Sequence, residues 1–340
     1  MSNRTFVLVL VLVTTVSISI TYVITRSLNH LSDKNNSVRM DEVHAGQSPR
    51  VICEVELTHE NDYKRIRPFL FAEDKCESDD LSDLKGLIED SVKAMHSAGK
   101  ITRAAVYFRD LNHSKWTSVN GTEMFYPASM LKVSIMMNVL KVAESDPRIL
   151  YMKSKVDKNI DLGESVNPSQ RLIPGKEYTV MELLEAMMKR SDNDATTLLF
   201  KFIDQNSYDK LFTNLNINVP EPQDFYYSIN PIDFSKFYRL IYHASYLNRG
   251  ASEYALKLMD GSEFKDGLQK KLPKGAEIIH KFGERNTKEG LSQFHDSGIV
   301  YLNGEAYLVI VMTEGPSAEQ LKDVVSDLSA ICYDYMRNMN

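Results

Sequence analysis

The chain has 340 residues, 43% of them hydrophobic, which is enough apolar material for a globular protein with a substantial core. Its formal net charge is −6 at pH 7, and no stripe of Lys and Arg runs along the sequence. Binding to nucleic acid needs such a stripe to neutralise phosphates, so the composition argues against a nucleic-acid partner.

The three cysteines are far apart and form no recognisable metal or redox motif. Cys53, Cys76 and Cys332 include no C-x-x-C pair and have no histidine at zinc spacing, so we expect no metal site and no cofactor. Cys53 and Cys76 are able to pair if the domain lies outside the cytoplasm. Cys332 lies between Ile331 and Tyr333 in a helical pattern, which predicts a buried small hydrophobic residue rather than a reactive thiol.

The first feature in chain order is an uncharged apolar run from Phe6 to Ile24, about the ~20 residues that a membrane-spanning helix needs. The run is longer than the roughly 7–15-residue core of a signal peptide, and no A-x-A cleavage site follows it. We therefore expect a single-pass membrane protein, with a short cytoplasmic tail at 1–5, an anchor at 6–24 and the rest of the chain on the extracytoplasmic side. Cleavage of this segment and secretion is the alternative.

Residues 25–76 are predicted to connect the anchor to the folded domain. The part from Ser27 to about Arg50 is polar with little periodicity, which is typical of a linker. Val51 to Lys75 regains apolar residues and is expected to dock on the domain rather than fold alone. Residues 77–340 are left as the globular domain.

Hydrophobic periodicity beyond Asp80 predicts a helix, two strands, a helical middle section, three strands and a closing helix. The last two strands are joined by Asn303-Gly304, a strong hairpin signal, and the last helix starts with Ser317 and Gln320 at capping-box spacing. The expected ranges are a helix over Leu81 to Met95 and strands over Ala104 to Arg109, Lys115 to Val119, Glu277 to Phe282, Gly298 to Leu302 and Ala306 to Thr313.

Strands at both ends of the domain with helices between them predict an α+β, two-lobed fold. One antiparallel sheet would be assembled from distant segments and flanked by the N- and C-terminal helices, with a separate helical lobe beside it. A cleft between the sheet and the lobe is the expected site.

Ser129-Met130-Leu131-Lys132 is the first of three short motifs that suggest chemistry. The bare S-x-x-K spacing says little, because it also occurs at Ser82, Ser97, Ser207 and Ser262. Only Ser129 follows an aromatic-Pro-Ala sequence and opens a helix that is apolar on nearly all sides, with Val133, Ile135, Met136, Met137, Val139 and Leu140. Such a helix is buried, so Ser129 and Lys132 would be carried into the interior.

Lys132 lies one turn after Ser129 on the same helical face, where its amine can reach the hydroxyl. Desolvation and the positive end of the helix dipole would lower the pKa of Lys132 and let it act as a base. The structural alternative is a serine that caps the helix, followed by a lysine whose head reaches water.

Ser191-Asp192-Asn193 is the second motif, between predicted helices at Met181 to Met188 and Ala195 to Phe202. One interpretation is simple capping of the second helix by Asp192 or Asn193. The functional interpretation places the Ser191 hydroxyl beside Lys132 as a proton relay and the Asn193 amide on a substrate carbonyl.

Lys281-Phe282-Gly283 in a predicted strand, followed by Glu284, is the third motif. A lysine on an edge strand commonly prevents sheets from pairing edge to edge. In the functional interpretation Lys281 attracts a substrate carboxylate, while Gly283 lets the substrate backbone approach closely.

Ser-x-x-Lys, Ser-Asp-Asn and Lys-x-Gly in this order resemble the motif set of class A β-lactamases and penicillin-binding proteins. The likeness runs from about Leu81 to the end of the chain. It implies that Ser129 is the acylated nucleophile and that Lys132 and Ser191 move protons. The backbone N–H groups of Ser129 and Glu284 would form the oxyanion hole.

Two departures from the family pattern bear on function. Phe282 stands where the family has Thr or Ser, which removes a hydroxyl that would help to hold a substrate carboxylate. The Glu-x-x-Leu-Asn motif, whose glutamate activates the deacylating water in class A enzymes, is not found after Ser191. Glu221 and Asp224 are the acids nearest to its expected place, and they are typical of solvated loop charges.

Three functions are consistent with these motifs and departures. The first is a membrane-anchored β-lactamase-like hydrolase that opens the β-lactam amide through an acyl-enzyme and deacylates weakly. The second is a penicillin-binding carboxypeptidase or transpeptidase that acts on the D-Ala-D-Ala end of peptidoglycan stem peptides. The third is a noncatalytic cell-wall-binding module, against which the joint presence of Ser129, Lys132, Ser191 and Lys281 argues. The sequence leaves the oligomeric state open.

Overall fold

The computed structural model describes residues 53–60, 63–157, 171–220 and 227–339. The chain divides into a small unit, which includes residues 53–56 and Asp74–Cys76, and a large unit of Leu57–Glu73 and Glu77 onward. In the small unit a disulfide joins Cys53 to Cys76, the pairing that the sequence left open. The expected tail and anchor at residues 1–24 lie outside the described residues. Among the helices of the described ranges, none is both long and apolar enough to cross a membrane.

A five-stranded antiparallel sheet forms the centre of the large unit, with its strands in the order β4-β3-β9-β8-β7. Segments from both ends of the domain build it, as predicted: β3 (Arg103–Asp110), β4 (Trp116–Val119), β7 (Glu277–Asn286), β8 (Ser292–Leu302) and β9 (Glu305–Gly315). At the turn between β8 and β9, Asn303 and Gly304 have φ of 54° and 85°, as a tight two-residue hairpin requires.

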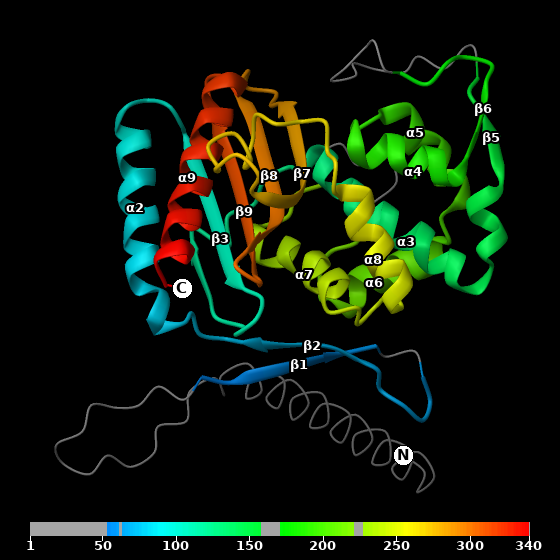
Figure 1. Cartoon of the computed structure of the whole chain (residues 1–340), viewed down its shortest axis with the longest axis horizontal. Coiled ribbons are helices and arrows are strands. Elements are labelled where there is room, and N and C mark those ends of the chain that lie inside the picture. Colours follow the sequence, from blue (N-terminus) through cyan, green and yellow to red (C-terminus); the bar gives the residue numbers. More distant parts are fainter. Residues whose placement is uncertain (1–52, 61–62, 158–170, 221–226, 340) are drawn as a thin grey trace, which may run out of the picture. The chain divides into compact units, whose positions relative to one another are not determined.

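Helices α2 (Ser82–Ser97) and α9 (Ala318–Met339) cover one face of this sheet (Figure 1). Alternating strand residues separate two cores. Val106 and Phe108 of β3 belong to the cluster under α2 and α9, whereas Ala105 and Tyr107 belong to the cluster on the other face. Cys332 of α9 is fully buried, as expected.

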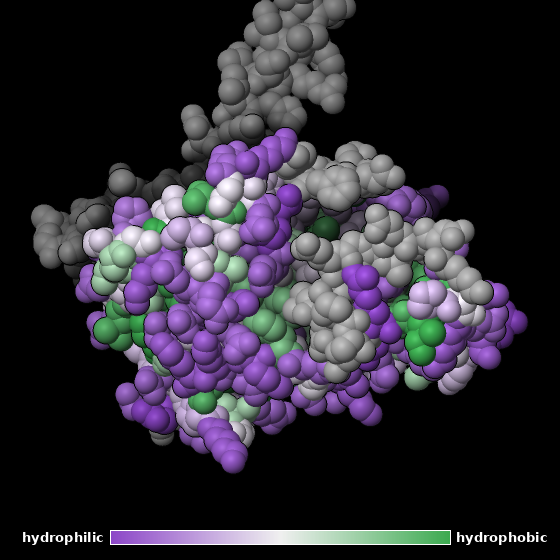
Figure 2. Space-filling model, turned by 90° about the horizontal axis from the view of Figure 1, so that it is seen from above, coloured by the Kyte–Doolittle hydropathy of each residue, from purple (hydrophilic) through white to green (hydrophobic). Residues whose placement is uncertain are grey.

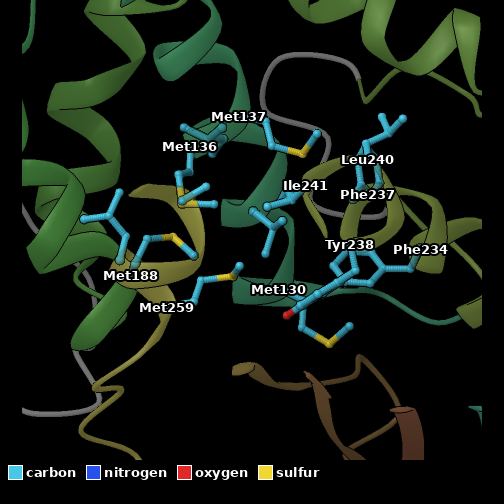
Figure 3. Packing of buried hydrophobic residues seen from close by; sticks show 14 of the residues in the cluster. Met130, Met136, Met137, Met188, Phe234, Phe237, Tyr238, Leu240, Ile241 and Met259 are labelled. Carbon is cyan, nitrogen blue, oxygen red and sulfur yellow. The ribbon is translucent and has the colours of Figure 1, made fainter. Parts of the chain in front are cut away.

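The helical lobe lies on the other side of the sheet (Figure 1). Its central helix α3 (Lys132–Ser145) is buried on nearly all sides, as its apolar sequence predicted. Methionines fill much of the surrounding core, and Figure 3 shows several of them with aromatic side chains of α7. The other elements are α4 (Val180–Lys189), α5 (Asn193–Leu199), α6 (Gln205–Asn214), α7 (Pro231–Tyr242), α8 (Arg249–Met259), short helical turns η1 (Asp79–Leu81), η2 (Ala128–Leu131), η3 (Pro147–Tyr151) and η5 (Phe200–Phe202), and the strands β5 (Lys153–Lys155) and β6 (Glu177–Thr179).

The segment expected to dock on the domain forms two strands that hydrophobic periodicity did not predict, β1 (Val55–His59) and β2 (Phe69–Asp74). Leu70 and Phe71 of β2 are buried in the larger core cluster of the large unit.

Two of the sheet strands extend beyond their predicted ends by four residues or more. β7 continues to Asn286 instead of ending at Phe282, and β8 begins at Ser292 instead of Gly298. The added residues are mostly polar, so hydrophobic periodicity does not reveal them, but backbone pairing between β7 and β8 holds them in the sheet.

The outer surface visible in Figure 2 is mainly hydrophilic, with apolar residues in separate small patches. This agrees with the 25% of charged residues in the sequence, because charged side chains are mostly exposed.

Candidate active site

Ser129 lies in the short turn η2, which leads directly into the buried helix α3. Ala128, just before it, has φ of 47°, a conformation that is unfavourable for a residue with a Cβ. The surrounding structure must therefore hold this turn in place, as is common where a side chain is positioned for function. Ser129 is partly buried, so its side chain keeps some access to solvent.

Lys132 is the first residue of α3 and is almost completely buried. Its Nζ donates hydrogen bonds to the Ser191 carbonyl (2.6 Å), the Asn193 Oδ1 (2.7 Å) and the Ser191 Oγ (3.2 Å). Burial lowers the pKa of Lys132 to about 7, although the nearby carboxylates of Asp192 and Asp194 act in the opposite direction. A substantial fraction of this amine is therefore neutral near neutral pH.

The Ser191-Asp192-Asn193 motif forms the connection between α4 and α5. Ser191 has φ of 56°, and Asp192 caps α5 by accepting a hydrogen bond from the Ala195 N–H at 2.8 Å. The capping interpretation is thus correct for Asp192. It does not account for the flanking residues, because Ser191 and Asn193 both contact Lys132.

Lys281 enters the same cluster from β7 and is buried to 1% exposure. Its Nζ donates to the Ser191 Oγ at 2.9 Å and to the Phe282 carbonyl at 3.0 Å. Burial, reinforced by the proximity of Lys132, holds the pKa of Lys281 well below its usual value. Two lysines therefore meet at one serine hydroxyl, from helix α3 and strand β7.

Gly283 brings the edge strand β7 against the turn that carries Ser129. A Cβ at this position would lie 2.4 Å from the Pro127 carbonyl oxygen and 3.2 Å from the Ser129 nitrogen, so no larger residue fits without moving backbone. The protein's own turn occupies the space where a side chain at this position would lie. The approach of a substrate to Gly283 stays a prediction. Glu284, the next residue, is exposed.

Phe282 is buried, and its ring stacks on Phe264 with centroids 3.9 Å apart. The Lys281 Nζ lies 4.4 Å from the centroid of the same ring. The position where the family has a hydroxyl thus presents an aromatic face to the amine of Lys281.

A buried pair that was not predicted from the sequence lies beside Lys281. The Nδ1 of His280 is 3.0 Å from both carboxylate oxygens of Asp296, which also accepts hydrogen bonds from the Leu268 and Ser297 N–H groups. His280 adjoins the third motif, but Asp296 stands 16 residues later and belongs to no motif. Only the pairing of β7 with β8 brings the two together.

A polar pocket of about 320 Å³ lies next to Tyr126, three residues before Ser129. Its lining includes Arg103, whose guanidinium donates to the Glu314 carboxylate at 3.0 and 3.1 Å. The remaining lining residues are Met124, Phe125, Ser228, Thr287 and Glu289. Across the described ranges, no group of three or more His, Cys, Asp or Glu residues is arranged to hold a metal ion.

The structure thus brings Lys132, Ser191, Asn193 and Lys281 into one hydrogen-bonded cluster, with Ser129 and Gly283 in the adjoining turn and strand. The model of the beta-lactamase enzyme family matches residues 87–336. The chain belongs to this family. Membership supports a serine hydrolase of the β-lactamase or penicillin-binding type.

Solved structures share the fold of this beta-lactamase family member at low sequence identity. A beta-lactamase from Chitinophaga pinensis has 18% identity and a TM-score of 0.67, over 75% of this chain and 99% of that one. PBP-A has 23% identity and a TM-score of 0.65, over 76% and 97% of the two chains. The TLA-1 extended-spectrum beta-lactamase has 19% identity and a TM-score of 0.67, over 75% and 98%. No match was found among curated proteins.

The two acids considered as replacements for the family's loop glutamate, Glu221 and Asp224, lie outside the described residues. Asn230 caps α7 by accepting a hydrogen bond from the Asp233 N–H at 2.8 Å, and Pro231 is the first residue of this helix. Asn230 and Pro231 therefore form a capped helix start.

Proposed function

We propose that the protein is a membrane-anchored serine hydrolase that opens the β-lactam amide through an acyl-enzyme on Ser129. The observation that carries this proposal is that Lys132, which lies one turn after Ser129 in the chain, meets Lys281 at the Ser191 Oγ. A structural core rarely buries two amines on one hydroxyl, because each charged amine is costly to desolvate. Lowered amine pKa values are typical of functional sites.

In the proposed reaction, neutral Lys132 accepts the proton of the Ser129 hydroxyl as its oxygen attacks the carbonyl carbon. The N–H groups of Ser129 and Glu284 donate to the developing oxyanion. As the C–N bond of the lactam breaks, Ser191 passes a proton to the departing nitrogen and is reprotonated by the Lys132 ammonium, which carries the proton taken from Ser129. The products are an ester on Ser129 and a secondary amine, so protons balance.

Deacylation is the weak step in this proposal. Hydrolysis of the ester needs an activated water, and the Glu-x-x-Leu-Asn motif that supplies the base in class A enzymes is absent from the sequence. General-base assistance is worth on the order of 10²–10⁴-fold in rate. Acylation, which uses Lys132, would survive this loss, and the adduct would persist.

A fluorescent penicillin tests the acylation step. We expect stoichiometric covalent labelling of the parent at Ser129, no labelling of Ser129→Ala, and unchanged labelling of Ser97→Ala, whose serine also begins an S-x-x-K pattern. Equal labelling of the parent and Ser129→Ala would show that the nucleophile is a different residue.

A chromogenic cephalosporin tests the deacylation step. The expected trace is a stoichiometric burst followed by slow turnover, with a long-lived adduct in the intact mass of the protein. Fast turnover without a burst would mean that another group activates the water, and Glu221 and Asp224 would then be the first residues to mutate.

A penicillin-binding peptidase is the second candidate, and the missing loop glutamate favours it. A mutant of PBP-A was solved as an acyl-enzyme complex with penicillin G, which supports stable acylation on this fold. Release of D-alanine from a D-Ala-D-Ala peptide, without cephalosporin turnover, would establish the peptidase. A folded protein that forms no adduct with either substrate would be a noncatalytic binding module.

A further inference from the structure

The hairpin of β1 and β2 carries large apolar side chains that face solvent. In the part of the hairpin that belongs to the large unit, Leu57, Tyr63, Ile66 and Phe69 are exposed by 57%, 52%, 59% and 51%. Leu57 lies on β1, Phe69 on β2, and the other two in the connection between them. Apolar groups gathered in one short exposed element are typical of a surface that contacts a partner or a membrane.

Three cations lie among these apolar residues. Lys64, Arg65 and Arg67 are all exposed and alternate with Tyr63, Ile66 and Phe69 along the chain. They outnumber the acids Glu60 and Asp62 of the same connection. Aromatic and aliphatic side chains mixed with Lys and Arg are the composition of segments that lie at the surface of an anionic bilayer.

The hairpin is attached to the rest of the large unit through β2. The buried guanidinium of Arg239 on α7 donates to the Glu73 carboxylate at 2.9 Å and to the Ala72 carbonyl at 2.6 Å, and it stacks on the ring of Phe71. A contact made by the exposed side of the hairpin would therefore fix the orientation of the whole large unit.

The length of chain before the hairpin is limited. Residues 25–52 separate the apolar run Phe6 to Ile24 from Cys53. Even fully extended, a segment of this length reaches at most roughly 100 Å. The hairpin follows directly after this segment. If the apolar run is the membrane anchor, the hairpin therefore stays within this distance of the bilayer.

We propose that the surface formed by Leu57, Tyr63–Arg67 and Phe69 docks on an anionic phospholipid bilayer. The apolar side chains enter the interface, and the three cations contact lipid phosphates. This docking goes beyond the hydrolase function and does not depend on the chemistry at Ser129.

Tryptophan fluorescence in vesicles tests the docking with the full chain. Phe69→Trp places a reporter in the surface, and Tyr151→Trp places a matched reporter on η3, where the native side chain is also exposed. Each variant is incorporated into phosphatidylcholine vesicles with or without phosphatidylglycerol, with bromine on the lipid acyl chains as quencher. We expect quenching and a blue shift for F69W in the anionic vesicles, and neither for Y151W.

Charge removal separates specific docking from general adsorption. Lys64→Gln/Arg65→Gln/Arg67→Gln in the F69W background should lower the equilibrium constant for docking by roughly 100-fold. Each cation near an anionic lipid surface contributes to the binding free energy, and the triple substitution removes three of them. The same change at Lys93, Lys265 and Lys274, exposed lysines of other segments, should leave the quenching unchanged.

Three results would overturn the proposal. They are no quenching of F69W, equal quenching of F69W and Y151W, or quenching that is insensitive to the triple substitution at the hairpin. A blue shift of F69W emission in the absence of lipid, together with dimers in analytical ultracentrifugation, would instead assign the surface to contact with a second copy of the chain. Loss of labelling in Ser129→Ala is a separate measurement, so failure of docking and failure of the proposed function are distinguishable.

Discussion

At the scale of single residues, the central feature is the hydroxyl of Ser191, which accepts hydrogen bonds from Lys132 at 3.2 Å and from Lys281 at 2.9 Å. Two ammonium groups at one oxygen would repel each other in a buried space, so at least one of the amines is neutral. The lowered pKa of Lys132, about 7, makes it the residue that can both take and release a proton near neutral pH.

The rate of acylation should therefore increase with the deprotonated fraction of the Lys132 amine. Only the neutral amine accepts the Ser129 proton, so the rate should fall about tenfold per pH unit below about pH 7 and level off above it. Stopped-flow labelling with a fluorescent penicillin measures this. Lys132→Ala should be slower by on the order of 10²–10⁴-fold and should lose this pH dependence. A profile with its midpoint unchanged in the alanine variant would assign the titration to another group.

A thermal measurement checks the same pKa independently of activity. Because the folded-state pKa of Lys132 lies near 7 and its unfolded value near 10.5, the unfolded chain binds the additional proton between these pH values. The stability of the parent should thus rise relative to Lys132→Met as the pH increases from about 7 toward 10. A constant difference in Tm between the two proteins would contradict the lowered pKa.

Substitution of Phe282 should change the preference for substrates that carry a carboxylate. Phe282→Thr restores the hydroxyl of the family pattern and removes the ring beside Lys281. A hydrogen bond to a charged group is worth about 1.5–3 kcal/mol, so acylation by benzylpenicillin should accelerate by roughly 10–100-fold. The methyl ester of penicillin, which lacks the carboxylate, should show no gain.

Loss of the stack on Phe264 destabilises this variant by roughly 3 kcal/mol, so its folding must be checked by circular dichroism. A folded Phe282→Thr that accelerates both substrates equally would mean that position 282 controls general access rather than the carboxylate.

At the scale of elements, prediction from sequence worked where hydrophobicity follows secondary structure. α2 and α3 have apolar patterns that match their burial, and the Asn303-Gly304 turn has the backbone that its residues favour. The polar ends of β7 and β8 were not predicted because strand pairing, rather than apolar periodicity, holds them in the sheet. The β1–β2 hairpin was not predicted for a related reason, since much of its apolar surface faces solvent.

Two glycines allow a matched test of how β7 packs on the turn that carries Ser129. Gly283→Ala would place its Cβ 2.4 Å from the Pro127 carbonyl oxygen, so the turn or the strand must move and acylation should fall steeply. Gly86→Ala on α2 meets nothing within 4 Å and replaces a poor helix former with the best one, so it should raise the stability by about 0.5–1 kcal/mol.

Denaturant unfolding and penicillin labelling of both variants measure these effects. Unchanged acylation in a folded Gly283→Ala would show that the close approach of β7 to Ser129 is not needed for the chemistry. Gly86→Ala should label like the parent.

At the scale of the whole molecule, the order of the three motifs was enough to assign the fold, because each motif lies on a different element that the fold brings together. Ser129 and Lys132 come from η2 and α3, Ser191 from the connection between α4 and α5, and Lys281 from β7. The partners of these residues were less predictable. Asp296 and Phe264 are ordinary residues in the sequence, and only tertiary packing places them beside the third motif.

The Cys53–Cys76 disulfide motivates a prediction about location, because structural disulfides persist in oxidising compartments and are rare in the cytosol. We predict that the domain lies on the extracytoplasmic side. Alkylation of the denatured, unreduced protein, isolated from cells under thiol-blocking conditions, should then modify one cysteine, Cys332, whose thiol is free and buried in the fold. Modification of all three cysteines of the sequence would indicate a reducing compartment.

Protease added to intact cells checks the same topology without reference to cysteine chemistry. Digestion of the domain before lysis should accompany modification of Cys332 alone, because both require the domain to be outside the cytoplasm. Cys53→Ser/Cys76→Ser is the control, since it removes the pair but not the route of export. It should therefore stay accessible to the protease while still offering one thiol, and its protection in intact cells would mean that the disulfide itself is needed for export.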